Sequence, residues 1–118
     1  MYDRGGKTAT GVNIMAKWID VCDVEKLRPA TFRVVDFDDL EVMVFNIDGE
    51  FYAIEDVCTH DGGPLSDGEL RGCEIICPRH AAKFDVRTGK VTAPPAYEDL
   101  VTYPTRVENG KVQVCDNR

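Results

Sequence analysis

The stretch CTHDGGPLSDGELRGCEIICPRH, residues 58–80, contains both histidines of the chain and three of its five cysteines. It begins with Cys58 and His60 and ends with Cys77 and His80. Its glycine, proline, serine and aspartate residues are typical of loops, so each end is predicted to lie in a loop beside a strand. Loops at the ends of strands can meet in space. We therefore interpret the stretch as one site built from two Cys/His pairs.

Two thiolates and two imidazoles form the donor set of two different kinds of metal site. A structural zinc ion binds four such ligands tetrahedrally, and a 2Fe–2S cluster can take two cysteines on one iron and two histidines on the other. Zinc fits less well, because zinc-finger cysteines usually stand about two to four residues apart and the histidines form a separate pair. A third interpretation, two unrelated surface loops, requires both histidines to fall beside cysteines by chance.

The rest of the chain predicts an all-β protein. β-branched and aromatic residues gather in short runs, which favour strands. The runs are TFRVVDF (31–37), LEVMVFNI (40–47), EFYAIED (50–56), CEIIC (73–77), KFDV (83–86), LVTYPTRV (100–107) and KVQVC (111–115). Three dipeptides are expected to turn the chain: Asp48-Gly49, Thr88-Gly89 and Asn109-Gly110. The only helical candidate is a single turn at 23–27. Strands at this spacing predict a small sandwich or barrel.

Composition narrows the class of protein further. A chain of 118 residues with 43% hydrophobic and 30% charged residues is typical of one soluble globular domain. We expect a disordered leader over 1–14, with Met15 as a candidate native start, and a single domain over 15–118. A net charge of −7 disfavours nucleic acid and anionic membranes as partners.

The chain shows no apolar run that could span a bilayer and no secretory signal. We therefore expect it in the cytoplasm, where thiols stay reduced and cysteine spacing indicates metal binding rather than disulfides.

The pattern C-x-H, sixteen residues, C-x-x-H resembles that of the Rieske iron–sulfur family. More closely, the chain is similar to the soluble Rieske-type ferredoxins that serve bacterial aromatic-ring dioxygenases. The resemblance runs from about Trp18 to Val114. It includes CTHDGGPLSDGEL, CPRHAAKFDVRTGK and the closing TYPTRVENGKVQV.

The resemblance implies antiparallel β-sheets, with a small cluster-binding subdomain over about 55–85 inserted in a base domain. It implies one 2Fe–2S cluster per chain, with Cys58 and Cys77 on the inner iron and His60 and His80 on the outer one. The chain would then be no enzyme. It would carry one electron from a flavin-dependent ferredoxin reductase to the Rieske centre of a terminal oxygenase, without binding a small-molecule substrate.

The same resemblance carries an expectation about the redox potential. High-potential Rieske proteins have two extra cysteines that join the cluster loops, and here those positions hold Gly63 and Arg79. They also donate hydroxyl hydrogen bonds from a serine and a tyrosine, whose positions here hold Ala82 and Phe84. Hydrogen bonds to the sulfur atoms stabilise the reduced cluster. The expected potential is therefore low, roughly −150 mV.

Three other functions compete with electron transfer. An oxygenase needs a mononuclear iron held by two histidines and a carboxylate, and no further histidine remains for it. A redox or accessory component of another system, such as cluster assembly or a nitrite reductase-like complex, stays an alternative, as does a zinc-binding interaction module.

Cys73 precedes Cys77 by four residues, a span of about 13 Å in a strand. We therefore interpret Cys73 as a buried apolar residue and not as a ligand.

Overall fold

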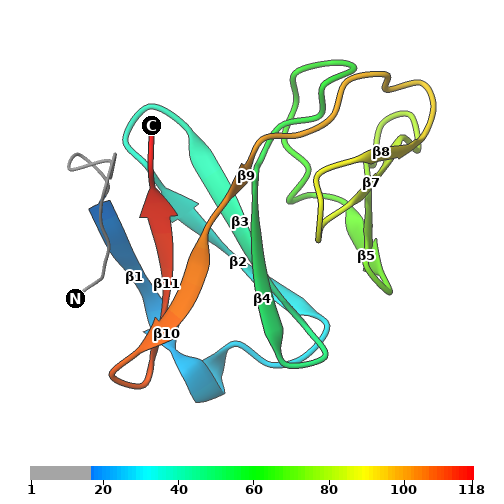
Figure 1. The fold of residues 1–118 in the computed structure, drawn as a ribbon. Helices are drawn as coiled ribbons and strands as arrows, with labels where there is room; N and C mark the ends of the chain where they lie inside the picture. Colours follow the sequence, from blue (N-terminus) through cyan, green and yellow to red (C-terminus); the bar gives the residue numbers. More distant parts are fainter. Residues whose placement is uncertain (1–16) are drawn as a thin grey trace.

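The computed structural model describes residues 17–118 as three antiparallel β-sheets (Figure 1). The first sheet has the order β1-β11-β10, formed by Lys17–Asp23, Lys111–Asp116 and Thr105–Glu108. The second has the order β2-β3-β4-β9, formed by Thr31–Asp36, Glu41–Ile47, Glu50–Glu55 and Thr102–Tyr103. The third has the order β5-β6-β7-β8, formed by Glu69–Arg71, Glu74–Ile76, Lys83–Asp85 and Val91–Ala93. The all-β prediction is thus confirmed. The leader expected over 1–14 and the candidate start at Met15 lie outside the described residues.

The only helix in the described part of the chain is the 3-10 turn η1, Val24–Lys26, which falls inside the predicted turn at 23–27. Within residues 17–118, therefore, no helix has the length and apolar character needed to cross a membrane.

Strand β3 is shared by two hydrophobic cores. Successive side chains of a strand point to opposite faces, and residues 42–46 of β3 are all buried. Met43 and Phe45 pack into a first core cluster, which also takes residues from β6 and β7 in the third sheet. Val42 and Val44 pack into a second core cluster together with residues of β11 in the first sheet. The second sheet is therefore covered on both faces.

Two of the predicted turns have the expected hairpin geometry. Asp48 and Gly49 have φ values of 54° and 90°, and Asn109 and Gly110 have values of 54° and 76°. A type I′ turn needs positive φ at both central residues. These turns connect β3 to β4 and β10 to β11, so the predicted hairpins are confirmed.

The predicted strand at 100–107 is instead two strands in two sheets. β9 pairs with β4, whereas β10 pairs with β11. Pro104 separates them because it has no N–H for a sheet hydrogen bond, and its carbonyl accepts a bond of 2.9 Å from Cys115 N. Strands β1, β5 and β8 were not predicted. β5 and β8 have only three residues each, too few for a periodic pattern to stand out.

Asn46 is the only polar side chain buried among residues 17–118. Its Nδ2 donates to the carbonyl of Leu27 at 2.7 Å, and its Oδ1 accepts from Gly49 N at 2.8 Å. A buried polar group is costly unless it is hydrogen-bonded. Asn46 therefore joins the β3–β4 turn to the segment that follows η1.

The substitution Asn46→Ala should lower the free energy of unfolding by about 1–3 kcal/mol, because it leaves a buried carbonyl and a backbone N–H without partners. Chemical denaturation followed by circular dichroism measures this difference. Glu108→Gln, on exposed strand β10, is the control and should stay within about 0.5 kcal/mol of the wild type. Equal stability of Asn46→Ala and the control would contradict this role.

Candidate metal centre

Two loops of matching construction form the candidate site. We call residues 58–63 the first ligand loop and residues 77–82 the second ligand loop. In the first, Gly62 N donates to Cys58 O, and Cys58 N donates to Gly63 O, both at 2.7 Å. The second repeats this pattern four and five residues after its cysteine: Ala81 N donates to Cys77 O at 3.0 Å and Cys77 N to Ala82 O at 2.8 Å.

The fourth residue after each cysteine has a left-handed backbone. The φ value is 78° at Gly62 and 64° at Ala81. A non-glycine residue seldom adopts this region, so the second ligand loop accepts a strained position to complete the same turn. Both loops thereby curl their backbone around a cysteine.

The first ligand loop is fastened at both ends to the rest of the fold. Asp56 accepts hydrogen bonds from Leu65 N at 2.6 Å and from Ser66 N at 2.8 Å, and Ser66 Oγ donates to its second oxygen at 2.6 Å. Leu65 itself is fully buried in the first core cluster. Thr59 Oγ1 donates to the carbonyl of Glu98 at 2.7 Å, which ties the loop to the segment before β9. Sequence patterns did not single out these anchors.

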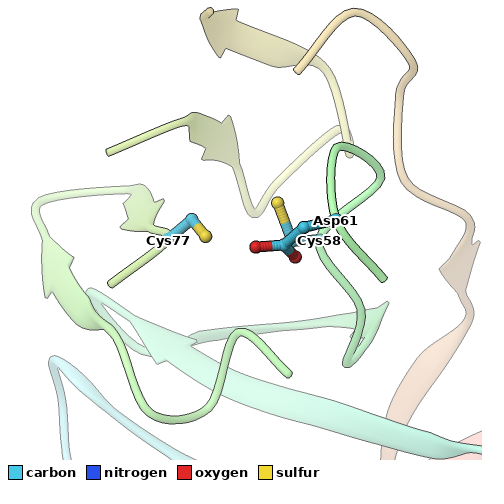
Figure 2. Close-up of side chains that lie close together, drawn as sticks. All are labelled: Cys58, Asp61 and Cys77. Atoms are coloured by element: carbon cyan, nitrogen blue, oxygen red, sulfur yellow. The ribbon is translucent and has the colours of Figure 1, made fainter. Parts of the chain in front are cut away.

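The structure brings the two cysteines together in the interior and the two histidines together at the surface. Figure 2 shows Cys77 facing Cys58, with the Asp61 carboxylate beside Cys58. One ligand atom from each of Cys58, Asp61 and Cys77 lies within 4.8 Å of the others. The His60 and His80 rings meet edge to face, with their centroids 4.9 Å apart. Both cysteines are buried and both histidines are exposed.

The environment of the cysteines suits a cation. Burial raises the pKa of the Cys58 thiol, although the His60 and Asp61 backbone acts in the opposite direction, and the adjacent Cys77 raises it further. The buried Cys58 thiol therefore resists ionisation. A bound metal ion removes this penalty, because it deprotonates the thiols that coordinate it. Two thiols and two imidazoles thus fit a metal group that takes both sulfur and nitrogen ligands.

Asp61 is the residue at the site that ligand spacing did not reveal. Its Oδ2 accepts from Arg79 Nε at 2.5 Å, and its Oδ1 accepts from Gly63 N at 2.9 Å. The Arg79 guanidinium and the Gly63 amide hold the pKa of the Asp61 carboxyl well below its usual range. The same pairing raises the pKa of Arg79. His80 Nδ1 lies 3.5 Å from Asp61 Oδ2.

The structure pairs Asp61 and Arg79 with each other across the two ligand loops. Both oxygens of Asp61 are occupied, so its carboxylate is not a free metal ligand. The signal that could have found the pair is an aspartate three residues after one cysteine and an arginine two residues after the other.

Cys73 stands apart from the other donors. It precedes β6, whereas Cys77 follows it, so the whole strand separates the two thiols. The prediction that Cys73 is buried is wrong: it is partly exposed, since it follows the turn at Gly72. Ala82 and Phe84 are fully buried in the same core cluster as Cys58 and Cys77.

Comparison with known proteins points to one family. Residues 17–104 match the Rieske [2Fe-2S] domain. The chain is 45% identical over 98 residues to the biphenyl dioxygenase ferredoxin subunit of Pseudomonas sp. (strain KKS102), covering 82% of this chain and 90% of that protein. It is 37% identical over 97 residues to the ferredoxin component of the naphthalene 1,2-dioxygenase/salicylate 5-hydroxylase systems of Ralstonia sp., covering 82% and 93%.

A solved structure agrees with these relatives. The fold superimposes with a TM-score of 0.81, at 34% identity, on a chain from the complex of reduced oxygenase and oxidized ferredoxin in carbazole 1,9a-dioxygenase, covering 86% of this chain and 94% of that one. The three antiparallel sheets described above are accordingly the Rieske fold that the sequence pattern implied. With this fold, and with relatives of nearly its own length that are ferredoxin components, the chain belongs to the Rieske 2Fe–2S family.

Proposed function

We propose that this chain is the ferredoxin component of a multicomponent aromatic-ring dioxygenase system. It accepts one electron from a flavin-dependent ferredoxin reductase and delivers it to the Rieske centre of the terminal oxygenase. The named relatives, which are ferredoxin components of such systems, support this role. So does the structural match to a complex that contains an oxygenase and a ferredoxin. The chain is an electron carrier and not the oxygenase, and we place it in the cytoplasm with the enzymes it serves.

The ligand assignment is part of this proposal. Cys58 and Cys77 hold the inner iron, and His60 and His80 hold the outer one. A bound 2Fe–2S cluster supplies reversible one-electron chemistry. The observation that carries the assignment is that two loops of matching construction bring Cys58 close to Cys77 in the interior and His60 against His80 at the surface. The side chain of His80 is 51% exposed, so the imidazoles present an edge that a partner can approach.

We also propose one domain over 15–118, with a cluster-binding subdomain over about 55–85 set into a base domain. Both ligand loops and strands β5–β7 fall within that range. The first and second sheets, which share the second core cluster, would form the base. This division explains why the two core clusters are distinct although β3 contributes to both.

The first test is the identity of the metal and its ligands. Purified protein should contain two irons per chain and show the visible spectrum of a Rieske cluster. His60→Ala and His80→Ala should each abolish that spectrum, because one iron loses a ligand. Cys73→Ser is the matched control and should keep it, since strand β6 separates Cys73 from Cys77. Metal analysis measures the iron content, and absorption spectroscopy detects the cluster in each variant. A colourless protein with bound zinc would contradict the cluster assignment.

The redox potential gives a second test. Redox titration should place the midpoint near the low end of the Rieske range, roughly −150 mV. Phe84→Tyr, which restores a hydroxyl where high-potential relatives have one, should raise the midpoint by about 20–60 mV, the equivalent of one hydrogen bond. Phe37→Tyr makes the same chemical change in the second core cluster and should leave the midpoint unchanged. A wild-type midpoint well above zero would overturn this expectation.

Reconstituted turnover tests the function itself. A candidate terminal oxygenase and reductase, encoded beside this chain, should form hydroxylated product only when the wild-type ferredoxin is added. His80→Ala should support no product, whereas Cys73→Ser should support the wild-type rate. If every pairing fails with this chain and succeeds with another small ferredoxin, the chain belongs to a different redox system.

A further inference from the structure

We propose that Arg79, Asp61 and Gly63 form an electrostatic strap that closes the two ligand loops on each other. The strap holds both loops in position through contacts that none of the four proposed ligand side chains makes. The inference deepens the proposed function and rests on it, because the strap matters only if these two loops carry the ligands.

The strap consists of three hydrogen bonds from one guanidinium. Arg79 lies in the second ligand loop, and all three acceptor atoms belong to the first ligand loop or the residue after it. Arg79 Nε donates to Asp61 Oδ2 at 2.5 Å, and Arg79 Nη2 reaches Asp61 Oδ1 at 3.2 Å. The same Nη2 donates to the carbonyl of Pro64 at 2.9 Å. A planar guanidinium that donates from two nitrogens fixes both the direction and the distance of its acceptors, which a lysine ammonium does not do.

Gly63 makes room for the strap. A Cβ atom at this position would lie 2.7 Å from Arg79 Cζ and 2.8 Å from Arg79 Nη2, closer than nonbonded atoms tolerate. Ala82, the matching residue of the second ligand loop, carries a buried methyl group. The two loops therefore differ at this position because the guanidinium passes over only one of them.

The Arg79–Asp61 pair is partly shielded from solvent. The side chains of Arg79 and Asp61 are 32% and 19% exposed, against 69% and 63% for Arg71 and Glu69. Exposed single pairs contribute little to stability. The Arg79–Asp61 pair is more shielded than that pair, uses both Nε and Nη2 of the guanidinium and joins the two ligand loops, so it restrains their relative placement.

Asp61 also lies close to His80, and this allows a rival interpretation. The carboxylate could act on the His80 ring, whose Nδ1 is 3.5 Å away, and leave Arg79 as a bystander. The two interpretations differ in one respect. If the strap holds the loops, replacing Asp61 should have little further effect once Arg79 has been replaced. If Asp61 acts only on His80, replacing Asp61 should have its full effect even without Arg79.

The test is amide hydrogen exchange on the full chain, both with iron bound and after its removal, in the variants Arg79→Gln, Asp61→Asn and the double variant. The amides of Gly62 and Ala81 close the two ligand loops and report their opening. Each single variant should accelerate their exchange about five- to tenfold and should speed iron loss to a chelator similarly. Amides of β3 and β4 should be unaffected, and the effect of the double variant should be smaller than the sum of the two single effects.

Gly63→Ala provides an independent arm because it changes no charge. Its methyl group should displace the guanidinium and accelerate loop exchange as Arg79→Gln does. In the Arg79→Gln background, Gly63→Ala should cause no further acceleration. Arg79→Lys, which keeps the charge without the planar guanidinium, should recover part of the protection. Arg118→Gln removes a guanidinium bound to Asp39 and Asp116 and serves as the matched control, with loop exchange as in the wild type.

Additive effects of Arg79→Gln and Asp61→Asn would overturn the strap, as would unchanged loop exchange in Gly63→Ala. Acceleration that is equal in the loops and in β3 would show a general loss of stability instead. The measurements on the iron-free chain do not depend on which metal the protein carries. A failure of the strap is therefore distinguishable from a failure of the proposed function.

Discussion

Two thiols buried side by side set the condition that the rest of this structure must meet. Cys58 and Cys77 are 0% and 1% exposed, and burial together with the neighbouring Cys77 raises the pKa of the Cys58 thiol. Only a cation held between them makes two thiolates stable in such a place. On the proposed assignment, the fold buries the two sulfur ligands and leaves both histidines exposed.

The fold meets the condition by placing the two ligand loops on a rigid support. Met43 and Phe45 of β3 pack in the same core cluster as both cysteines. Asp56 and Thr59 fix the first ligand loop from outside the site. Because packed interiors resist deformation, the distance between the cysteines is determined by the sheets, and the surface pair of Arg79 and Asp61 then needs to adjust only the loop tips.

Sequence patterns predicted the features that depend on residue type at fixed spacing. The Cys/His pairs, the two type I′ turns and the long strands β3 and β4 are of this kind. Features that depend on tertiary contacts escaped prediction. β5 and β8 are strands only because β6 and β7 lie beside them. Pro104 directs the chain from one sheet to another. The pairing of Arg79 with Asp61 requires that two loops distant in sequence already lie against each other.

The central claim is that both histidines and two cysteines bind one cluster, and isotope labelling tests it directly. His60 and His80 are the only histidines of the chain, so ¹⁵N-histidine labels no other side chain. Electron–nuclear double resonance of the reduced, labelled protein should show strong coupling to two ¹⁵N nuclei. A reduced cluster without coupling to histidine nitrogen would contradict the account, because all its ligands would then have to come from elsewhere.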